Sequence, residues 1–158
     1  MARRHAALTP FRKGNSMSDK IFVPEGETPP SSQIGATLEA LCSTIAARRD
    51  AGEESYTHRL LTGSLDAPLK KVAEEAVEVA LAAKDVQSAV SQNDEAADAA
   101  IDHLRYEAAD VVYHLLVVLE RFGISIDEFA AELNSRMTSE ERPCGAVRLK
   151  PEHIKRGK

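Results

Sequence analysis

Residues 70–78 read KKVAEEAVE and residues 107–117 read EAADVVYHLLV, and these two stretches decide the fold that we predict. In each stretch the carboxylates are three or four residues apart, a spacing that stacks them on one face of a helix. Two such faces turned toward each other would gather oxygen ligands of the kind that Mg²⁺ prefers. The pattern therefore predicts two long helices with a candidate divalent-metal site between them.

The composition also favours helices over strands. Hydrophobic residues make up 43% of the 158 residues, but aromatic residues make up only 4% and Trp is absent. Such a chain packs most readily through small aliphatic side chains on helices. We predict a single all-α domain, a four- to five-helix bundle with tails at both ends.

Apolar residues recur at helical spacing in several segments. The expected helices are 33–50, 55–61, 67–90, 95–122 and 126–137, and a break before Leu104 is an alternative for the fourth. Ser55 and Asp66 are predicted N-caps, and Ser125 begins a predicted capping box with Glu128. In the third helix the predicted apolar stripe is Val72, Ala76, Val79, Ala80 and Ala83, with the carboxylates on a neighbouring arc.

We expect these helices to form one domain at 34–138. Residues 1–33 contain several Pro, Gly and Ser residues and are expected to be a disordered extension, with Met17 as a candidate alternative start. Residues 139–158 are expected to be a loose C-terminal tail.

Charge, hydropathy and cysteine content limit the partners. The formal net charge is −5, whereas general nucleic-acid binding usually requires a basic surface. The longest apolar run, at 111–119, is too short to span a bilayer. Cys42 is expected to pack as a small apolar residue and Cys144 lies in the tail, which is no disulfide framework and fits a reducing cytoplasm. We therefore expect a cytoplasmic protein without a nucleic-acid or membrane partner.

The first acidic stretch also has a simpler interpretation as a solvated face. Lys70 pairs with Glu74 and Lys71 with Glu75 at i,i+4, and each such pair stabilises a helix by only about 0.2–0.5 kcal/mol. By spacing alone, this interpretation is favoured slightly for the first stretch.

The second stretch is harder to explain in this way, because Glu107 and Asp110 lie beside a strongly apolar segment. Two carboxylates roughly 4 Å apart repel by about 1–4 kcal/mol, and a bound cation removes that cost. Other chemistries lack their motifs, since the sequence contains no P-loop, G-x-G-x-x-G, H-E-x-x-H or G-x-S-x-G. Of the five histidines, only His114 is expected near the carboxylates.

Taken with SYT at 55–57 and YHLLV at 113–117, the two acidic stretches closely resemble the phosphoribosyl-ATP pyrophosphohydrolase family, one of the MazG-like all-α nucleoside triphosphate pyrophosphohydrolases. The shared signature is E-E-x-x-E followed by E-x-x-D. The resemblance covers about 36–137. It departs from the family at about 85–103, which looks longer than usual and is expected to extend the tip of a helical hairpin away from the site.

The resemblance implies hydrolysis of phosphoribosyl-ATP to phosphoribosyl-AMP and pyrophosphate, the second step of histidine biosynthesis. It assigns the signature carboxylates to one or more Mg²⁺ ions, which neutralise the triphosphate and activate a water. These carboxylates are Glu74, Glu75, Glu78, Glu107 and Asp110. Glu74 and Glu75 are the candidate catalytic residues, with Glu74 as a candidate general base.

The resemblance also implies substrate contacts and an assembly. The candidate substrate-binding residues are Lys70, Lys71, Tyr56, Thr57, Arg59 and Lys84. For the two adjacent lysines, a solvated helix start is the alternative. A homodimer with sites near the interface is expected, because members of the family pack their long helices together.

Two other functions stay open. A related pyrophosphohydrolase that removes non-standard nucleoside triphosphates would need the same carboxylates. A non-enzymatic helical interaction module would carry the acidic faces only as solvated surface.

Overall fold

The computed structural model describes residues 20–92 and 96–154. The chain divides into two units between Gln33 and Ile34, and we describe each by itself. In the first unit, residues 20–32 contain a turn near Gly26 and neither helix nor strand. The rest of the expected disordered extension, at 1–19, lies outside the described residues, so that expectation stays a prediction.

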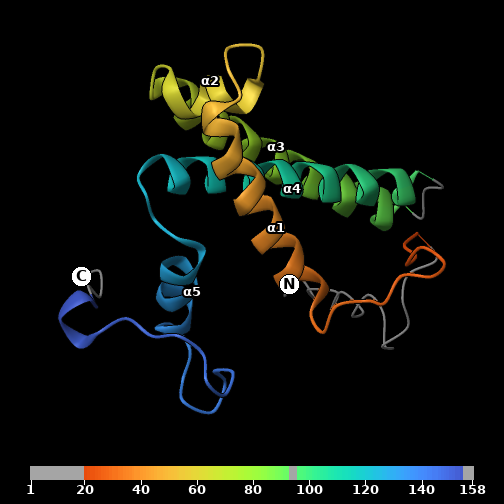
Figure 1. Cartoon of the computed structure of the whole chain (residues 1–158). Helices are drawn as coiled ribbons and strands as arrows, with labels where there is room; N and C mark the ends of the chain where they lie inside the picture. Colours follow the sequence, from red (N-terminus) through yellow and green to blue (C-terminus); the bar gives the residue numbers. More distant parts are fainter. Residues whose placement is uncertain (1–19, 93–95, 155–158) are drawn as a thin grey trace, which may run out of the picture. The chain divides into compact units, whose positions relative to one another are not determined.

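The second unit is helical throughout, and its described residues contain no strand. The helices are α1 (Gln33–Ala47, which begins at the boundary), the 3-10 turn η1 (Arg48–Asp50), α2 (Tyr56–Thr62), α3 (Asp66–Ser91), α4 (Ala97–Arg121), α5 (Ile126–Asn134) and the 3-10 turn η2 (Pro151–His153). Figure 1 shows the two longest helices, α3 and α4, lying side by side. The predicted all-α class with five helices is confirmed.

The seam between α3 and α4 follows a seven-residue repeat. The buried residues of α3 are Pro68, Glu75 and Ala82, each seven positions after the last, and Glu107 and His114 of α4 show the same separation. A seven-residue repeat keeps one line of side chains facing a partner helix. Carboxylates therefore occupy positions where packed helices normally place apolar side chains.

The predicted apolar stripe of α3 is wrong in part. Ala76, Ala80 and Ala83 are exposed, whereas Glu75 is buried. Alanine has too little side-chain surface to determine which face of a helix turns inward. The contact with α4 therefore determines which face of α3 is buried, and the seven-residue repeat marks that face.

An apolar core beyond this seam anchors the shorter helices. Ile45 of α1, Leu60 and Leu61 of α2, and Leu116 and Val117 of α4 form one buried cluster. Cys42 packs against it as expected. This core fixes α2 beside the middle and the C-terminal half of α4, close to the buried carboxylates.

The caps decide where the helices begin. Ser55 accepts a hydrogen bond from the backbone N–H of His58, and Ser125 and Glu128 form the predicted capping box. Asp66 was wrongly predicted as an N-cap, because Leu65 holds that position and Asp66 is the first helical residue. Ser64 accepts from the Asp66 N–H at 3.3 Å, so the helix begins one residue earlier.

Two other helices can be compared with the prediction. Helix α4 is unbroken from Ala97 to Arg121, and the Ala100 N–H bonds the carbonyl of Ala96 at 3.0 Å, so the predicted continuous helix holds and the alternative of a break before Leu104 is excluded. Helix α5 ends at Asn134 instead of near residue 137, because the backbone then forms i,i+3 hydrogen bonds, from Arg136 to Leu133 and from Met137 to Asn134. The Arg142 guanidinium also bonds the carbonyl of Asn134 at 2.8 Å. The longer segment at 85–103 continues α3 to Ser91 and α4 from Ala97 as helix, with Gln92 and Ala96 in turns and 93–95 outside the described residues.

None of the helices in the described part combines the length and the apolar composition that a bilayer crossing requires.

Candidate metal centre

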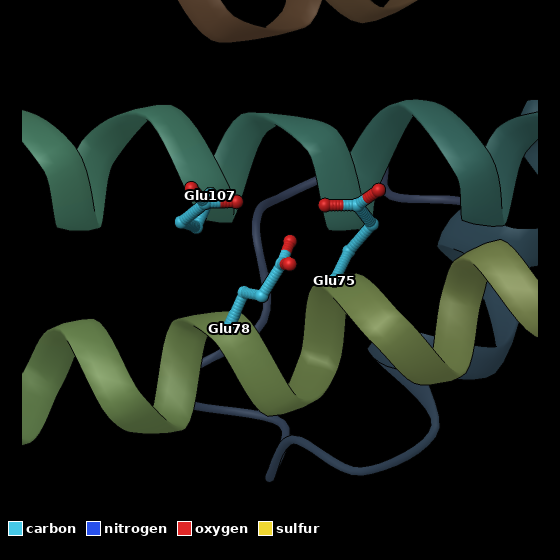
Figure 2. Close-up of side chains that lie close together, drawn as sticks. All are labelled: Glu75, Glu78 and Glu107. Carbon is cyan, nitrogen blue, oxygen red and sulfur yellow. The ribbon is translucent and has the colours of Figure 1, made fainter.

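Three carboxylates meet between α3 and α4. Glu75 and Glu78 reach across from α3, and Glu107 faces them from α4 (Figure 2). One oxygen from each lies within 4.8 Å of the others. Glu75 is only 5% exposed and Glu107 6%, while Glu78 opens the cluster to solvent. The first and second acidic stretches thus contribute to one site.

The charges of this cluster are only partly neutralised. Lys71 donates to Glu75 Oε1 at 3.0 Å, and this hydrogen bond lowers the pKa of Glu75. The pKa of Glu78 is raised instead, first by its hydrogen bond to Glu75 and then by burial and the charges of Glu75 and Glu107. Excess negative charge among hard oxygen donors is the chemistry that a cation such as Mg²⁺ satisfies, so these residues fit a metal ion.

Glu74 lies on the neighbouring arc, outside the three-carboxylate cluster. Its oxygens lie 3.2 Å from Lys70 Nζ and 3.3 Å from Lys71 Nζ, which confirms the expected Lys70–Glu74 pair and adds a second. The hydrogen bond from Lys70, followed by that from Lys71, lowers the pKa of Glu74. Lys71 therefore joins the exposed carboxylate of Glu74 to the buried carboxylate of Glu75.

Asp110 is half-buried one turn after Glu107, and the cluster of three does not include it. The Asp110 charge is the largest cause that raises the pKa of Tyr106, and burial and a hydrogen bond between the two side chains add to it. Its charge also acts on Tyr56 and His114. Asp110 thus borders the site on the side of α2.

The segment that begins α2 contributes to the site in two ways. Burial raises the pKa of Tyr56, whose ring meets that of His114 edge-on at 6.2 Å and feels the charges of Lys71 and Glu75. Thr57 Oγ1 lies 2.7 Å from Tyr113 Oη, a hydrogen bond that ties α2 to α4. Tyr56 therefore borders the site, while the hydroxyl of Thr57 is engaged by the protein itself.

Two candidate substrate-binding residues have their contacts elsewhere. Arg59 Nη1 donates to the carbonyl of Glu53 at 2.6 Å and fixes the loop before α2. Lys84 donates to Gln87 on the exposed side of α3 at 3.0 Å. The structure does not bring either side chain into contact with the three carboxylates.

The expectation that only His114 lies near the carboxylates is wrong. His103 Nε2 lies 2.8 Å from Glu107 Oε1, and the two residues are one turn apart on α4. This i,i+4 spacing is visible in the sequence. His114 is also present, with Nε2 3.8 Å from Glu75 Oε1, and burial lowers its pKa so that the ring is neutral near pH 7.

Comparisons with known proteins show which sequences this chain is similar to. The chain is 41% identical over 100 residues to the phosphoribosyl-ATP pyrophosphatase of Limosilactobacillus fermentum, covering 63% of this chain and 82% of that protein. It is 42% identical over 118 residues to the phosphoribosyl-ATP pyrophosphatase of Methylobacterium nodulans, covering 73% and 96%. It is also 40% identical over 108 residues to the histidine biosynthesis bifunctional protein HisIE of Halalkalibacterium halodurans, covering 68% and 44%.

No solved structure matches the chain. The family model described as phosphoribosyl-ATP pyrophosphohydrolase matches residues 38–137. The matched span holds the apolar core, the helices α2 to α5 and every carboxylate discussed above. The chain therefore belongs to the phosphoribosyl-ATP pyrophosphohydrolase family.

Proposed function

We propose that this protein hydrolyses phosphoribosyl-ATP to phosphoribosyl-AMP and pyrophosphate, the second step of histidine biosynthesis. The observation that carries the proposal is the meeting of Glu75, Glu78 and Glu107 within 4.8 Å in a chain of this family. The printed names of its relatives, phosphoribosyl-ATP pyrophosphatase, support the choice of substrate.

In this proposal Glu75, Glu78 and Glu107 hold Mg²⁺, and Asp110, one turn further along α4, is a further ligand. All are oxygen donors, and a hard cation prefers such donors. When bound, Mg²⁺ neutralises the triphosphate and polarises the phosphorus that is attacked. The raised pKa of Glu78 supports the assignment, because it arises first from a proton held in the hydrogen bond to Glu75 and then from burial and the charges of Glu75 and Glu107, and a cation would take the place of that proton.

Glu74 is the proposed general base. It lies beside the cluster, its side chain is partly open to solvent, and its lowered pKa keeps it ionised at neutral pH. The water oxygen forms a new bond to the phosphorus that is attacked. The bond between that phosphorus and the oxygen bridging the α- and β-phosphates breaks, and pyrophosphate leaves. Glu74 accepts the proton that the water loses.

Lys70 and Lys71 are the proposed phosphate contacts. Both ammonium groups lie next to Glu74, so they present positive charge beside the acidic cluster. Tyr56 borders the same site and is the proposed contact for the phosphoribosyl part of the substrate. Thr57, Arg59 and Lys84 receive no substrate contact here, because their polar groups bond Tyr113, the Glu53 carbonyl and Gln87 and none of them pairs with a carboxylate of the site.

A substrate panel tests the proposed reaction against its nearest alternative. A pyrophosphohydrolase for non-standard nucleoside triphosphates would use the same carboxylates, so the metal cluster alone does not discriminate. We expect kcat/KM for phosphoribosyl-ATP to exceed that for each triphosphate of a standard and non-standard panel by at least about 100-fold, or roughly 2.7 kcal/mol. A better substrate among the simple triphosphates would contradict the proposal.

We also propose that the protein is a homodimer. Leu69, Val77 and Leu81 of α3 are 45%, 58% and 60% exposed and lie eight and four residues apart, on one face. Burial of a fully exposed side chain of this kind contributes about 1.5–3 kcal/mol, and burying the remaining exposed part of these three would contribute about half of that each, which makes the stripe a candidate contact for a second copy. Light scattering at micromolar concentration tests the mass, and a monomer would contradict this part of the proposal.

A further inference from the structure

His114 is the buried histidine of the helical seam. It is only 5% exposed, and two tyrosine rings enclose it, Tyr113 with centroids 5.0 Å apart and Tyr56 at 6.2 Å, both edge-on. Tyr113 is held in turn by its hydrogen bond to Thr57 of α2. Side chains from two helices therefore fix where the imidazole lies.

The polar atoms of this ring are not explained by packing. Nδ1 is buried and has no hydrogen-bond partner among the described residues. Nε2 lies 3.8 Å from Glu75 Oε1, so a shift of roughly 1 Å makes a normal hydrogen bond. Buried polar atoms are nearly always paired, and Nε2 is the nitrogen of this ring that has a carboxylate near it.

We propose that His114 is a positioning residue for Glu75 in the metal site. The proton is assigned to Nε2, because an ionised carboxylate only accepts hydrogen bonds. Lys71 donates to the same oxygen, Oε1, at 3.0 Å. With Oε1 occupied by two donors, the other oxygen of Glu75 is left for the metal ion.

The position of Glu75 makes this support necessary. Figure 2 shows its carboxylate lying against α4, with one oxygen turned toward Glu107 and the other turned away. Lys71 alone is a weak anchor, because it is shared with Glu74 and lies on a flexible stem. The residues around a metal's direct ligands commonly orient them, and their loss typically costs 10–100-fold in metal affinity.

In this inference, the first residues of α2 also help to hold the imidazole of His114 in place. Thr57 holds Tyr113 and Tyr56 meets His114, so these side chains stabilise the imidazole that supports Glu75. The inference rests on the proposed metal site, and its test must separate the two.

Calorimetric titration of the purified full-length chain with MgCl₂ alone tests the proposal. We expect His114→Leu to raise the Mg²⁺ dissociation constant by about 10–100-fold. His114→Gln is expected to recover most of that loss, because its amide N–H reaches to where Nε2 lies. In pyrophosphate release, the Mg²⁺ concentration for half-maximal rate should rise by the same factor, while kcat at saturating Mg²⁺ is retained.

Val117→Ala is the matched control. Val117 lies one turn after His114 in the apolar core, away from the carboxylates. Unchanged Mg²⁺ affinity in His114→Leu, equal losses in the Leu and Gln variants, or an equal loss in Val117→Ala would each overturn the proposal. If the unsubstituted chain binds no Mg²⁺, the proposed metal site fails and this inference fails with it. If that chain binds and the variants match it, only this inference fails.

Discussion

Glu78 carries the clearest sign of strain at the scale of single residues. Its pKa is raised in the folded protein, so the folded protein binds this proton more tightly than the unfolded chain does. The resulting contribution to stability is fully present below the unfolded pKa, near 4.5, and is lost as the pH rises through the folded pKa. As the pH rises to neutral, the metal-free protein therefore loses the Glu78–Glu75 hydrogen bond and gains the repulsion of Glu78 by Glu75 and Glu107.

Glu78→Gln should consequently raise the melting temperature of the metal-free protein at pH 7 and leave it nearly unchanged at pH 4. With Mg²⁺ the order should reverse, because binding at 100 times the dissociation constant stabilises the unsubstituted chain by about 2.7 kcal/mol. Scanning calorimetry with chelator and with Mg²⁺ measures both effects.

Glu39→Gln on the exposed side of α1 is the control for the lost charge. A lower melting temperature for Glu78→Gln in chelator at pH 7 would show that the cluster is not repulsive. If Mg²⁺ does not change the melting temperature of the unsubstituted chain, the result would favour the non-enzymatic alternative.

At the scale of helices, α5 depends on its cap more than on its core. Ala131 is its one buried residue, while Ser125 and Glu128 exchange the hydrogen bonds of a capping box. Ser125→Ala should lower the free energy of unfolding of this helix by about 1 kcal/mol. Hydrogen exchange of the α5 amides measures it.

Ser43→Ala in α1 provides the comparison, because that hydroxyl only bonds a carbonyl of its own helix, at 2.9 Å. It should leave exchange unchanged or slow it slightly. Equal protection of α5 in the two variants would mean that the capping box does not hold this helix.

The same contrast explains what the sequence could predict. Caps such as Ser55 and Ser125 are local, so the prediction and the structure agree there. The inward face of α3 depends on contact with α4, and the exposed Ala76, Ala80 and Ala83 gave too weak a signal to place it. The repeat Pro68, Glu75 and Ala82 marks the true seam, but a proline and a glutamate are not read as core residues.

The candidate site, like the fold, could be predicted from the sequence only in part. The carboxylate spacing and the family resemblance selected Glu75, Glu78 and Glu107, which meet in the structure. The separation of Glu74 from that cluster depends on side-chain contacts that the spacing alone does not give. In the structure Glu74 pairs with Lys70 and Lys71. The contact of His103 with Glu107 lies in the stretch at 85–103 that departs from the family, so the resemblance gives no signal for it, although the i,i+4 spacing is visible in the sequence.

At the scale of the whole molecule, a charge placed in the exposed apolar stripe of α3 should weaken the proposed dimer. Leu81→Glu should raise the dimer dissociation constant by at least about tenfold, or roughly 1.4 kcal/mol, because a carboxylate would be buried against apolar side chains. Sedimentation equilibrium measures the constant.

Ala46→Glu, on α1 and therefore outside the stripe, adds the same charge at an exposed position. It should leave the dimer intact. Equal weakening by both variants would point to general charge repulsion in place of the proposed interface.

The central claim is that one site, built by α3 and α4, performs Mg²⁺-dependent hydrolysis of phosphoribosyl-ATP. The most direct measurement is pyrophosphate release from phosphoribosyl-ATP by the unsubstituted chain and by Glu75→Gln, each with Mg²⁺ and with chelator. We predict release by the unsubstituted chain only with Mg²⁺, and a loss of at least about 100-fold in Glu75→Gln at an unchanged fold. Near-native turnover by Glu75→Gln, or equal turnover in chelator, would contradict the account.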